Sequence, residues 1–234
     1  MKKLFTLIAA VFALSAIASA DSFTTYSTRA AQNPTDIIDW SQLGPANTLV
    51  STPALITTFN GNLALAGNIN GGAFVRVDNV PGSWAGNFDY GENLVWTGNP
   101  NFGVGGGGPF AVELGTPVSS FGFAISADLY GAFTATVQVY DTMGHLLTTR
   151  TFSGISNGNF DGSALFIGLG DNAGVNIGGF IISTDSGNPL FANDFAIDDV
   201  SLSQTPLIPE PTTLVMLGSG LIGLAGAARR KLLA

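Results

Sequence analysis

Carboxylates crowd the end of the domain that precedes the C-terminal tail. Asp194, Asp198 and Asp199 lie in the segment NDFAIDD, within six residues of one another. Carboxylate, amide and backbone oxygens are the ligands that Ca²⁺ prefers, and it takes about six to eight of them. The cluster therefore predicts a structural calcium ion bound by these three aspartates. Alternatively these are turn formers, because Asp and Asn side chains also hydrogen-bond to nearby backbone, and no segment matches an EF-hand loop.

Aromatic residues gather in the segment SWAGNFDYGENLVW, residues 83–96, which also holds Asn, Asp and Gly. Exposed rings of Trp84, Tyr90 and Trp96 would stack on sugar rings, while the neighbouring polar side chains bind hydroxyl groups. This interpretation makes the protein a carbohydrate-binding module. The alternative is that the rings belong to the hydrophobic core, because aromatic side chains bury large apolar areas.

Residues for nucleophilic catalysis are scarce. The chain has one histidine, His145, and neither a G-x-S-x-G nor an H-E-x-x-H motif. Glycoside hydrolysis needs only two carboxylates across a cleft, and Glu92 and Glu113 are the only glutamates between residues 21 and 207. Nothing in the sequence pairs them. We therefore expect no enzymatic activity, with a glycoside hydrolase as the alternative.

The charge of residues 21–207 excludes one class of partner. This stretch has no lysine and only three arginines against fifteen acidic residues, a formal net charge of −12. Binding to a phosphate backbone requires clustered cations. The composition therefore excludes nucleic acid as a partner. It favours solubility and the retention of divalent cations. Cysteine is absent, so no disulfide or zinc–thiolate site stabilises the exported domain.

Alternating apolar and polar residues predict the elements that must position these side chains. Period-2 patterns and β-rich runs indicate half-buried strands, at residues 48–52, 55–59, 73–77, 110–114, 121–126, 133–140, 146–152, 164–169, 179–184 and 195–202. Residues 141–144 form a turn between two of these strands and predict a hairpin. No long amphipathic helix interrupts the pattern. The fold class expected is all-β, a jelly-roll-like β-sandwich.

The last expected strand changes its apolar face at Asp198-Asp199. Phe195 and Ile197 share one phase of the alternation, whereas Val200 and Leu202 share the other. A β-bulge that inserts one residue into the strand would explain this switch. Such a bulge would direct one or both carboxylates towards an edge of the sheet.

The first 20 residues are typical of a secretory signal peptide. A basic start is followed by an apolar stretch, and Ala18 and Ala20 form an A-x-A cleavage site immediately before Asp21. The apolar stretch is shorter than the ~20 residues that a transmembrane helix needs. We expect export by the Sec machinery and cleavage after Ala20, so that residues 1–20 take no part in the fold.

Residues 208–234 form a separate C-terminal tail. Pro209-Glu210-Pro211 precedes an uncharged, glycine-containing run over residues 212–228, and Arg229 and Arg230 follow that run. A helix over this run would be about 25 Å long, slightly short of the ~30 Å hydrocarbon core. Basic residues stay on the cytoplasmic side of a membrane. The tail therefore predicts a short transmembrane helix with residues 21–207 outside.

This tail resembles the PEP-CTERM protein-sorting signal. The Pro-Glu-Pro triplet, the apolar run and the basic end match that signal in order, spacing and position. The resemblance implies an exported protein of a Gram-negative bacterium with an exopolysaccharide and biofilm system. It implies transient inner-membrane anchoring, recognition of Pro209, Glu210 and Pro211 by an exosortase-type membrane protease, and delivery to the cell surface or extracellular matrix.

The expected organisation is a signal peptide at 1–20, a β-sandwich ectodomain at 21–207 and a sorting tail at 208–234. The expected function is that of a non-enzymatic surface or matrix protein associated with biofilm exopolysaccharide. The alternatives are a carbohydrate-binding module and a cryptic glycoside hydrolase.

Overall fold

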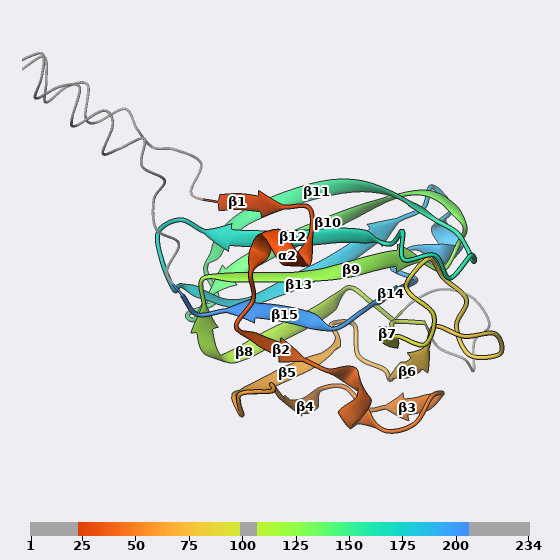
Figure 1. Cartoon of the computed structure of the whole chain (residues 1–234), viewed down its shortest axis with the longest axis horizontal. Helices are drawn as coiled ribbons and strands as arrows, with labels where there is room; N and C mark the ends of the chain where they lie inside the picture. Colours follow the sequence, from red (N-terminus) through yellow and green to blue (C-terminus); the bar gives the residue numbers. More distant parts are fainter. Residues whose placement is uncertain (1–22, 99–106, 206–234) are drawn as a thin grey trace, which may run out of the picture.

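A computed structural model describes residues 23–98 and 107–205, which fold into two antiparallel β-sheets packed face to face (Figure 1). We call the nine-stranded sheet sheet A and the six-stranded sheet sheet B. The expected all-β class is confirmed. The helices in the described residues are short: α2 (Arg29–Gln32), η1 (Trp40–Leu43) and η2 (Pro189–Phe191).

Sheet A contains both ends of the described chain. Its main path comprises β1 (Phe23–Tyr26), β12 (Leu165–Asp171), β9 (Ser120–Ala127), β14 (Phe195–Ile197), β7 (Asn93–Trp96), β6 (Phe74–Asp78) and β3 (Thr48–Val50). The last strand, β15 (Val200–Ser203), pairs with β9 beside β14, and β2 (Asp36–Ile38) pairs with β15. The N-terminal and C-terminal segments therefore meet in one sheet.

Sheet B is built mainly from longer strands. Its spatial order is β11 (Leu146–Ser156), β10 (Gly131–Asp141), β13 (Ile177–Asp185), β8 (Phe110–Val118), β5 (Leu63–Asn68) and β4 (Ala54–Thr57). β10 and β11 form the hairpin that the sequence predicts at residues 141–144.

The main core lies between the sheets and is rich in phenylalanine. Phe121 of sheet A and Phe180 of sheet B stack with their ring centroids 4.0 Å apart. Trp40 meets Phe110 edge to face with a centroid distance of 6.4 Å. Both contacts are among side chains that are almost completely buried, so the aromatic residues join the two layers.

A second, smaller core covers the opposite face of sheet A. Along β7, Val95 points into the main core and Leu94 points to the other side, where Trp84 and Phe88 pack against it. Ala196 of β14 belongs to the same small core, while its neighbours in sequence belong to the main one. Because side chains alternate across a strand, this cluster must lie on the outer face of sheet A.

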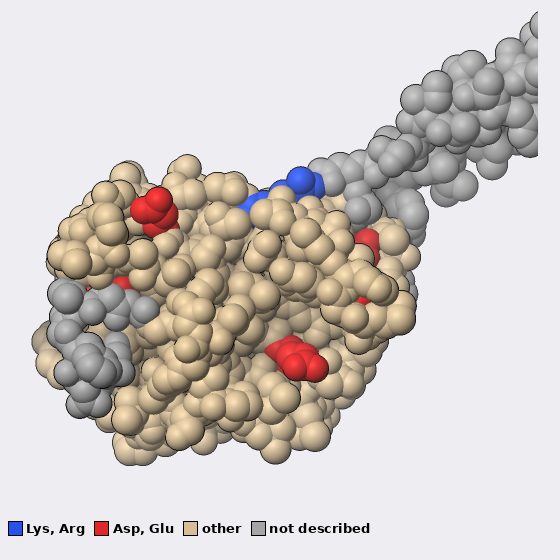
Figure 2. Space-filling view, turned by 180° about the vertical axis from the view of Figure 1, so that it is seen from behind, with Lys and Arg blue, Asp and Glu red and all other residues tan. Residues whose placement is uncertain are grey.

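The outer face of sheet B carries no comparable apolar layer among the described residues. Figure 2 views the molecule from that side, and most of the surface is uncharged. Acidic residues form small separate patches, and the basic atoms visible in this view lie at its upper edge. This face is therefore open and almost free of cations, with exposed leucines at its β4–β5 end, Leu55, Leu63 and Leu65.

The longer predicted strands are present, and the bulge at Asp198-Asp199 is confirmed. Ile197 pairs with Ile125, but Ser201 pairs with Gly122, so one extra residue is accommodated between them. β1, β2, β5 and β7 were not predicted. β1, β2 and β7 have only three or four residues, and β5 begins with alternating leucine and alanine, which shows no polar phase; pairing with neighbouring strands makes all four of them strands.

The signal peptide and the sorting tail lie outside the described residues. Ala18, Ala20 and Asp21 are therefore not described, and neither are Pro209 to Pro211 or Arg229-Arg230. The signal cleavage site and the helix over 212–228 therefore stay predictions. Within residues 23–98 and 107–205, none of the helices has the length and apolar character needed to span a bilayer.

Candidate functional site

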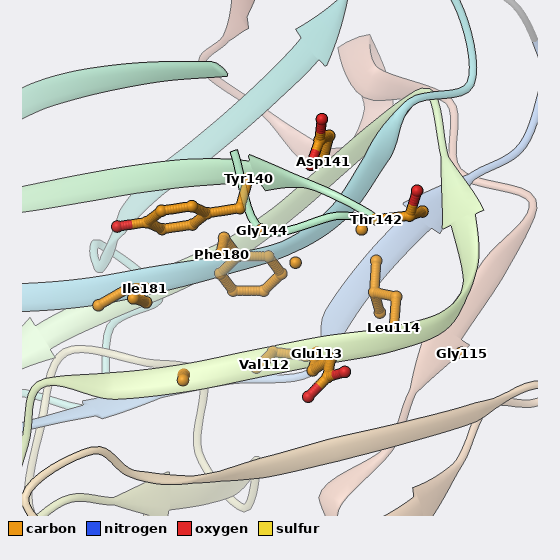
Figure 3. Close-up of a pocket in the computed structure, with 13 residues that line it drawn as sticks. Val112, Glu113, Leu114, Gly115, Tyr140, Asp141, Thr142, Gly144, Phe180 and Ile181 are labelled. Atoms are coloured by element: carbon orange, nitrogen blue, oxygen red, sulfur yellow. The ribbon is translucent and has the colours of Figure 1, made fainter. Parts of the chain in front are cut away.

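A groove with a volume of ≈ 440 Å³ opens where β8, β10 and β13 diverge in sheet B. Figure 3 shows the residues around it, which come from these three strands and from the turn that follows β10. Tyr140, Glu113 and Ile181 stand on its sides, and Gly178 and Gly179 form part of its floor.

Two irregularities of pairing create the groove. On one side of β13, Tyr140 pairs with Gly179 but Asp141 pairs with Ile177, so Gly178 is an extra residue. On the other side, Gly179 pairs with Glu113 but Ile177 pairs with Val118, so β8 carries three extra residues. The bulges separate the strands locally, because an unpaired residue disrupts the ladder and bends its strand.

Glycine is required at the floor because neighbouring backbone lies too close for a side chain. A Cβ at Gly179 would lie 2.7 Å from the Val112 carbonyl oxygen, and one at Gly178 would lie 2.6 Å from Thr142 Cα. Neither distance is compatible with an unmoved backbone. The glycine pair therefore gives close backbone packing and leaves a floor of bare peptide groups.

The rim of the groove is ordered by the β10–β11 turn. The Asp141 carboxylate accepts hydrogen bonds from the backbone N–H groups of Met143 and His145, each at 2.8 Å. Its second oxygen lies 2.9 Å from His145 Nδ1. The backbone hydrogen bond from His145 and the other contacts of the turn hold the pKa of Asp141 below its usual value. Asp141 is therefore an ionised acceptor at neutral pH.

These groups suit a polyhydroxylated ligand. Tyr140 offers an aromatic face beside the glycine floor, and the Glu113 carboxylate accepts hydrogen bonds from hydroxyl groups, whereas the Asp141 carboxylate is engaged by the turn. The described residues that line the groove include neither Lys nor Arg. A phosphate or sulfate group would therefore lack a cation to pair with.

The aromatic platform that the sequence suggested is not formed. Trp84 is only 4% exposed and packs on Phe88, so its ring belongs to the small core. Trp96 packs against the same core, and its indole Nε1–H donates to Asp194 at 2.7 Å. Tyr90 is 70% exposed and meets Phe160 edge to face. The indole rings are used to stabilise the fold by burying apolar surface, so they are not exposed to a ligand.

The three aspartates considered for calcium have protein partners instead. Asp194 accepts from Trp96, and the Asp199 carboxylate accepts from the backbone N–H of Trp40 at 3.4 Å. Asp198 accepts from the Ala124 N–H at 2.5 Å and from Arg29 Nη2 at 2.6 Å. No group of three or more acidic or histidine side chains that could hold a metal occurs within residues 23–98 and 107–205. The described structure therefore gives the calcium prediction no support.

The bulge explains why Asp198 is turned into the sheet. Its backbone N–H donates to the Ala124 carbonyl, while its carboxylate accepts from the Ala124 N–H. The side chain thus replaces a backbone acceptor in the ladder. Burial raises the pKa of Asp198 to about 8, although Arg29 and the Ala124 N–H act in the opposite direction. Burial likewise raises the pKa of Asp199 to about 6.

The two glutamates considered for glycoside hydrolysis line different hollows. Glu113 belongs to the groove in sheet B. Glu92 lines a hollow of ≈ 350 Å³ outside sheet A, together with Arg29, Asp89 and Asp198. Burial raises the pKa of Glu92. The structure therefore does not bring Glu92 and Glu113 together across one cleft.

Sequence reasoning missed the groove and its central residues. The alternation in residues 133–140 places Tyr140 on the outer face, and the double glycine in the strand IGGFIIST is a recognised sign of a bulge. What the sequence did not reveal is that these two features are cross-strand neighbours. That pairing joins residues almost forty positions apart.

Comparison with known proteins identifies the sorting motif of the tail but assigns no function to the β-sandwich domain. The model of the PEP-CTERM protein-sorting motif matches residues 207–231. No curated protein matches the sequence.

Among solved structures, a DUF4465 family protein from Bacteroides caccae is similar with a TM-score of 0.40 and 10% identity, over 72% of this chain and 100% of that chain. A family 29 carbohydrate-binding module is similar with a TM-score of 0.26 and 11% identity, over 64% of this chain and 99% of that chain. The enzymatically active domain of bacteriophage CBA120 tailspike protein 4 is similar with a TM-score of 0.27 and 10% identity, over 78% of this chain and 19% of that chain. None of these likenesses indicates what this chain binds.

Proposed function

We propose that this chain, which carries a PEP-CTERM sorting motif behind an all-β domain, is a surface or extracellular-matrix protein of a Gram-negative bacterium. An exosortase-type membrane protease processes its tail after Sec-dependent export, and the released domain associates with biofilm exopolysaccharide. The observation that carries this proposal is the match of residues 207–231 to the sorting motif.

The position of the motif relative to the domain supports processing. The last strand, β15, ends at Ser203, and only five residues separate it from Pro209. A tail held in the membrane would therefore keep the folded domain close to the bilayer. Cleavage near Pro209-Glu210-Pro211 frees the domain without cutting a strand of the sandwich.

Intact mass spectrometry of the protein from its native host tests this proposal. The expected product begins at Asp21 and ends near the Pro-Glu-Pro triplet. Glu210→Ala should leave the tail attached, whereas Glu113→Ala, a matched change outside the motif, should not affect processing. A wild-type product that retains residues 214–234 would refute the sorting model.

We propose in addition that the groove in sheet B binds carbohydrate without cleaving it. The pairing of Tyr140 with a glycine floor, beside the Glu113 carboxylate, favours sugar binding. Hydrolysis needs a general acid with a raised pKa, and the pKa of Asp141 is lowered instead.

A glycan array followed by a reducing-end assay separates binding from hydrolysis. Wild-type protein should bind a subset of glycans and release no reducing ends from them. Tyr140→Ala should abolish binding, while Tyr90→Ala, which removes an exposed tyrosine elsewhere, should not. Release of reducing ends that depends on Glu113 or Asp141 would show that the groove is a hydrolase site.

A further inference from the structure

A second hollow lies on the same face of sheet B, at the opposite end of the β10–β13 ladder from the groove. It has a volume of ≈ 670 Å³, and hydroxyl, carboxylate and amide side chains line it. Thr134 and Thr136 come from β10, Ser183 and Asp185 come from β13, and Asn193 comes from the segment after η2. Hydroxyl and amide groups both donate and accept hydrogen bonds, as sugar hydroxyl groups require.

One ladder connects the two hollows. Thr134 pairs with Asp185 and Thr136 with Ser183 at the second hollow, and Tyr140 pairs with Gly179 at the groove. The intervening pair is Gln138 with Ile181. All four pairs share the outer face, because the residues between them on β10, Ala135, Val137 and Val139, are buried in the main core.

The neighbouring strand extends this polar surface. On β11, Ser153, Thr151 and Thr149 pair with Thr134, Thr136 and Gln138, and all three are exposed. From Thr134 to Tyr140 the ladder is about 20 Å long, at roughly 3.3 Å per residue. The face between the hollows is therefore an extended surface on which hydroxyl and amide groups surround the single apolar side chain of Ile181, with a hollow at each end.

The charge around this surface limits the ligand. Glu113 and Asp141 line the groove and Asp185 lines the second hollow, and neither lining includes Lys or Arg among the described residues. Arg150 of β11 pairs with Val137, so it lies on the other phase of the alternation. Like charges repel a polyanion from such a face. A neutral or amine-bearing sugar chain is compatible with it.

We propose that the two hollows are the ends of one track, which binds the interior of a linear polysaccharide that carries no anionic groups. This inference rests on the carbohydrate-binding function proposed above and specifies its ligand. Tyr140 stacks on one sugar ring at the groove, the Gln138–Ile181 pair underlies the chain, and Thr136 and Ser183 bind hydroxyl groups at the second hollow. A ligand that occupies only the groove would leave the Thr136–Ser183 and Thr134–Asp185 pairs without a contact.

Calorimetry on the exported, processed protein tests the track with three sets of defined oligomers. These are β-1,4-glucose oligomers, β-1,4-glucosamine oligomers and β-1,4-mannuronate oligomers, each as a dimer and as a hexamer. The Kd for the favoured neutral or amine-bearing hexamer should be about tenfold or more below that for its dimer. Mannuronate oligomers should bind more weakly than both other sets.

Variants at the two ends separate the track from simple groove binding. Tyr140→Ala and the pair Thr136→Ala with Ser183→Ala should each weaken hexamer binding by about tenfold, while Tyr90→Ala should leave it unchanged. Equal affinities for dimer and hexamer, or a loss confined to Tyr140→Ala, would overturn the track but keep sugar binding at the groove. Tightest binding of mannuronate would overturn the charge argument. Failure to bind any glycan, including those of the array, would instead refute the carbohydrate-binding function itself.

Discussion

The outer faces of the two sheets differ in what covers them. On sheet A, Trp84, Phe88 and their neighbours form a second apolar core, and the N-terminal segment with α2 lies across the strands (Figure 1). On sheet B, the described residues leave the strands open to solvent, with a hollow at each end of the β10–β13 ladder. The aromatic side chains of sheet A thus stabilise the fold, whereas Tyr140 of sheet B is available to a ligand.

The N-terminal segment also joins the two ends of the domain. Gln32 exchanges hydrogen bonds with Ser201, accepting from its hydroxyl at 2.5 Å and donating to its carbonyl at 3.2 Å. The Trp40 indole N–H donates to the Asp198 carbonyl at 2.7 Å. Because these contacts fix β15, which leads into the sorting tail, we infer that sheet A serves stability and sheet B serves recognition.

The largest expected effect is the loss of the apolar cover of sheet A. Trp84→Ala should lower the free energy of unfolding by about 3–5 kcal/mol, because it removes a buried indole and leaves a cavity beside Phe88. Urea denaturation measures this change. Tyr90→Ala, which removes a ring from a residue that is 70% exposed, should lower the free energy of unfolding far less. Similar costs for the two variants would mean that the 79–92 segment is not a second core.

The next effect concerns the pH dependence conferred by Asp198. Its pKa of about 8 in the folded state lies above its ordinary value of 3.8, so between these values the folded protein holds a proton that the unfolded chain releases. The free energy of unfolding therefore falls as pH rises through this window. Between pH 6 and pH 8 the decrease due to this group should be about 2 kcal/mol.

Comparison with Asp198→Asn isolates that contribution. The variant cannot titrate at this position, so most of the decrease in stability between pH 6 and pH 8 should disappear. Asp199, whose pKa is about 6, contributes mainly below this range. Urea unfolding at several pH values gives both curves. Wild-type stability that stays constant over the same range would show that Arg29 keeps the carboxylate ionised in the folded state as well.

The same contrast separates what the sequence could predict from what it could not. The strict alternation of residues 110–114 and 133–140 reflects burial of one face, so the long strands were predictable. The phase switch at Asp198-Asp199 revealed the bulge for the same reason. Short strands such as β2 and β7 were missed, because pairing with distant partners decides their conformation.

The candidate site was harder to predict, because its residues meet only in the folded sheet. The sequence indicates Trp84, Tyr90 and Trp96 as candidates for a ligand or for the core, but not that the indole rings pack into a second core; it places Tyr140 on an outer face, but not beside a groove. The groove arises from pairing irregularities among three strands that are distant in sequence. A single sequence gives the glycines but not the strands that diverge around them.

A smaller effect is expected when the floor of the groove is filled. Gly179→Ala places a Cβ 2.7 Å from the Val112 carbonyl oxygen, so β8 or β13 must shift. The free energy of unfolding should fall by about 1–2 kcal/mol, and glycan binding should be lost. Ser183→Ala, on the outer face of the same strand, should leave stability nearly unchanged. Tolerance of Gly179→Ala with normal binding would mean that the bare floor is not needed.

The smallest effect on stability should accompany a clear effect on binding. Thr136→Val keeps the β-branched shape on β10 and removes only the hydroxyl group of a partly exposed side chain. The free energy of unfolding should therefore stay within about 0.5 kcal/mol of the wild-type value, while hexamer affinity falls severalfold. The conservative variant Thr136→Ser should restore binding, since it restores the hydroxyl. A change in stability without a change in binding would make the open face of sheet B structural as well, and the contrast between the two sheets would not hold.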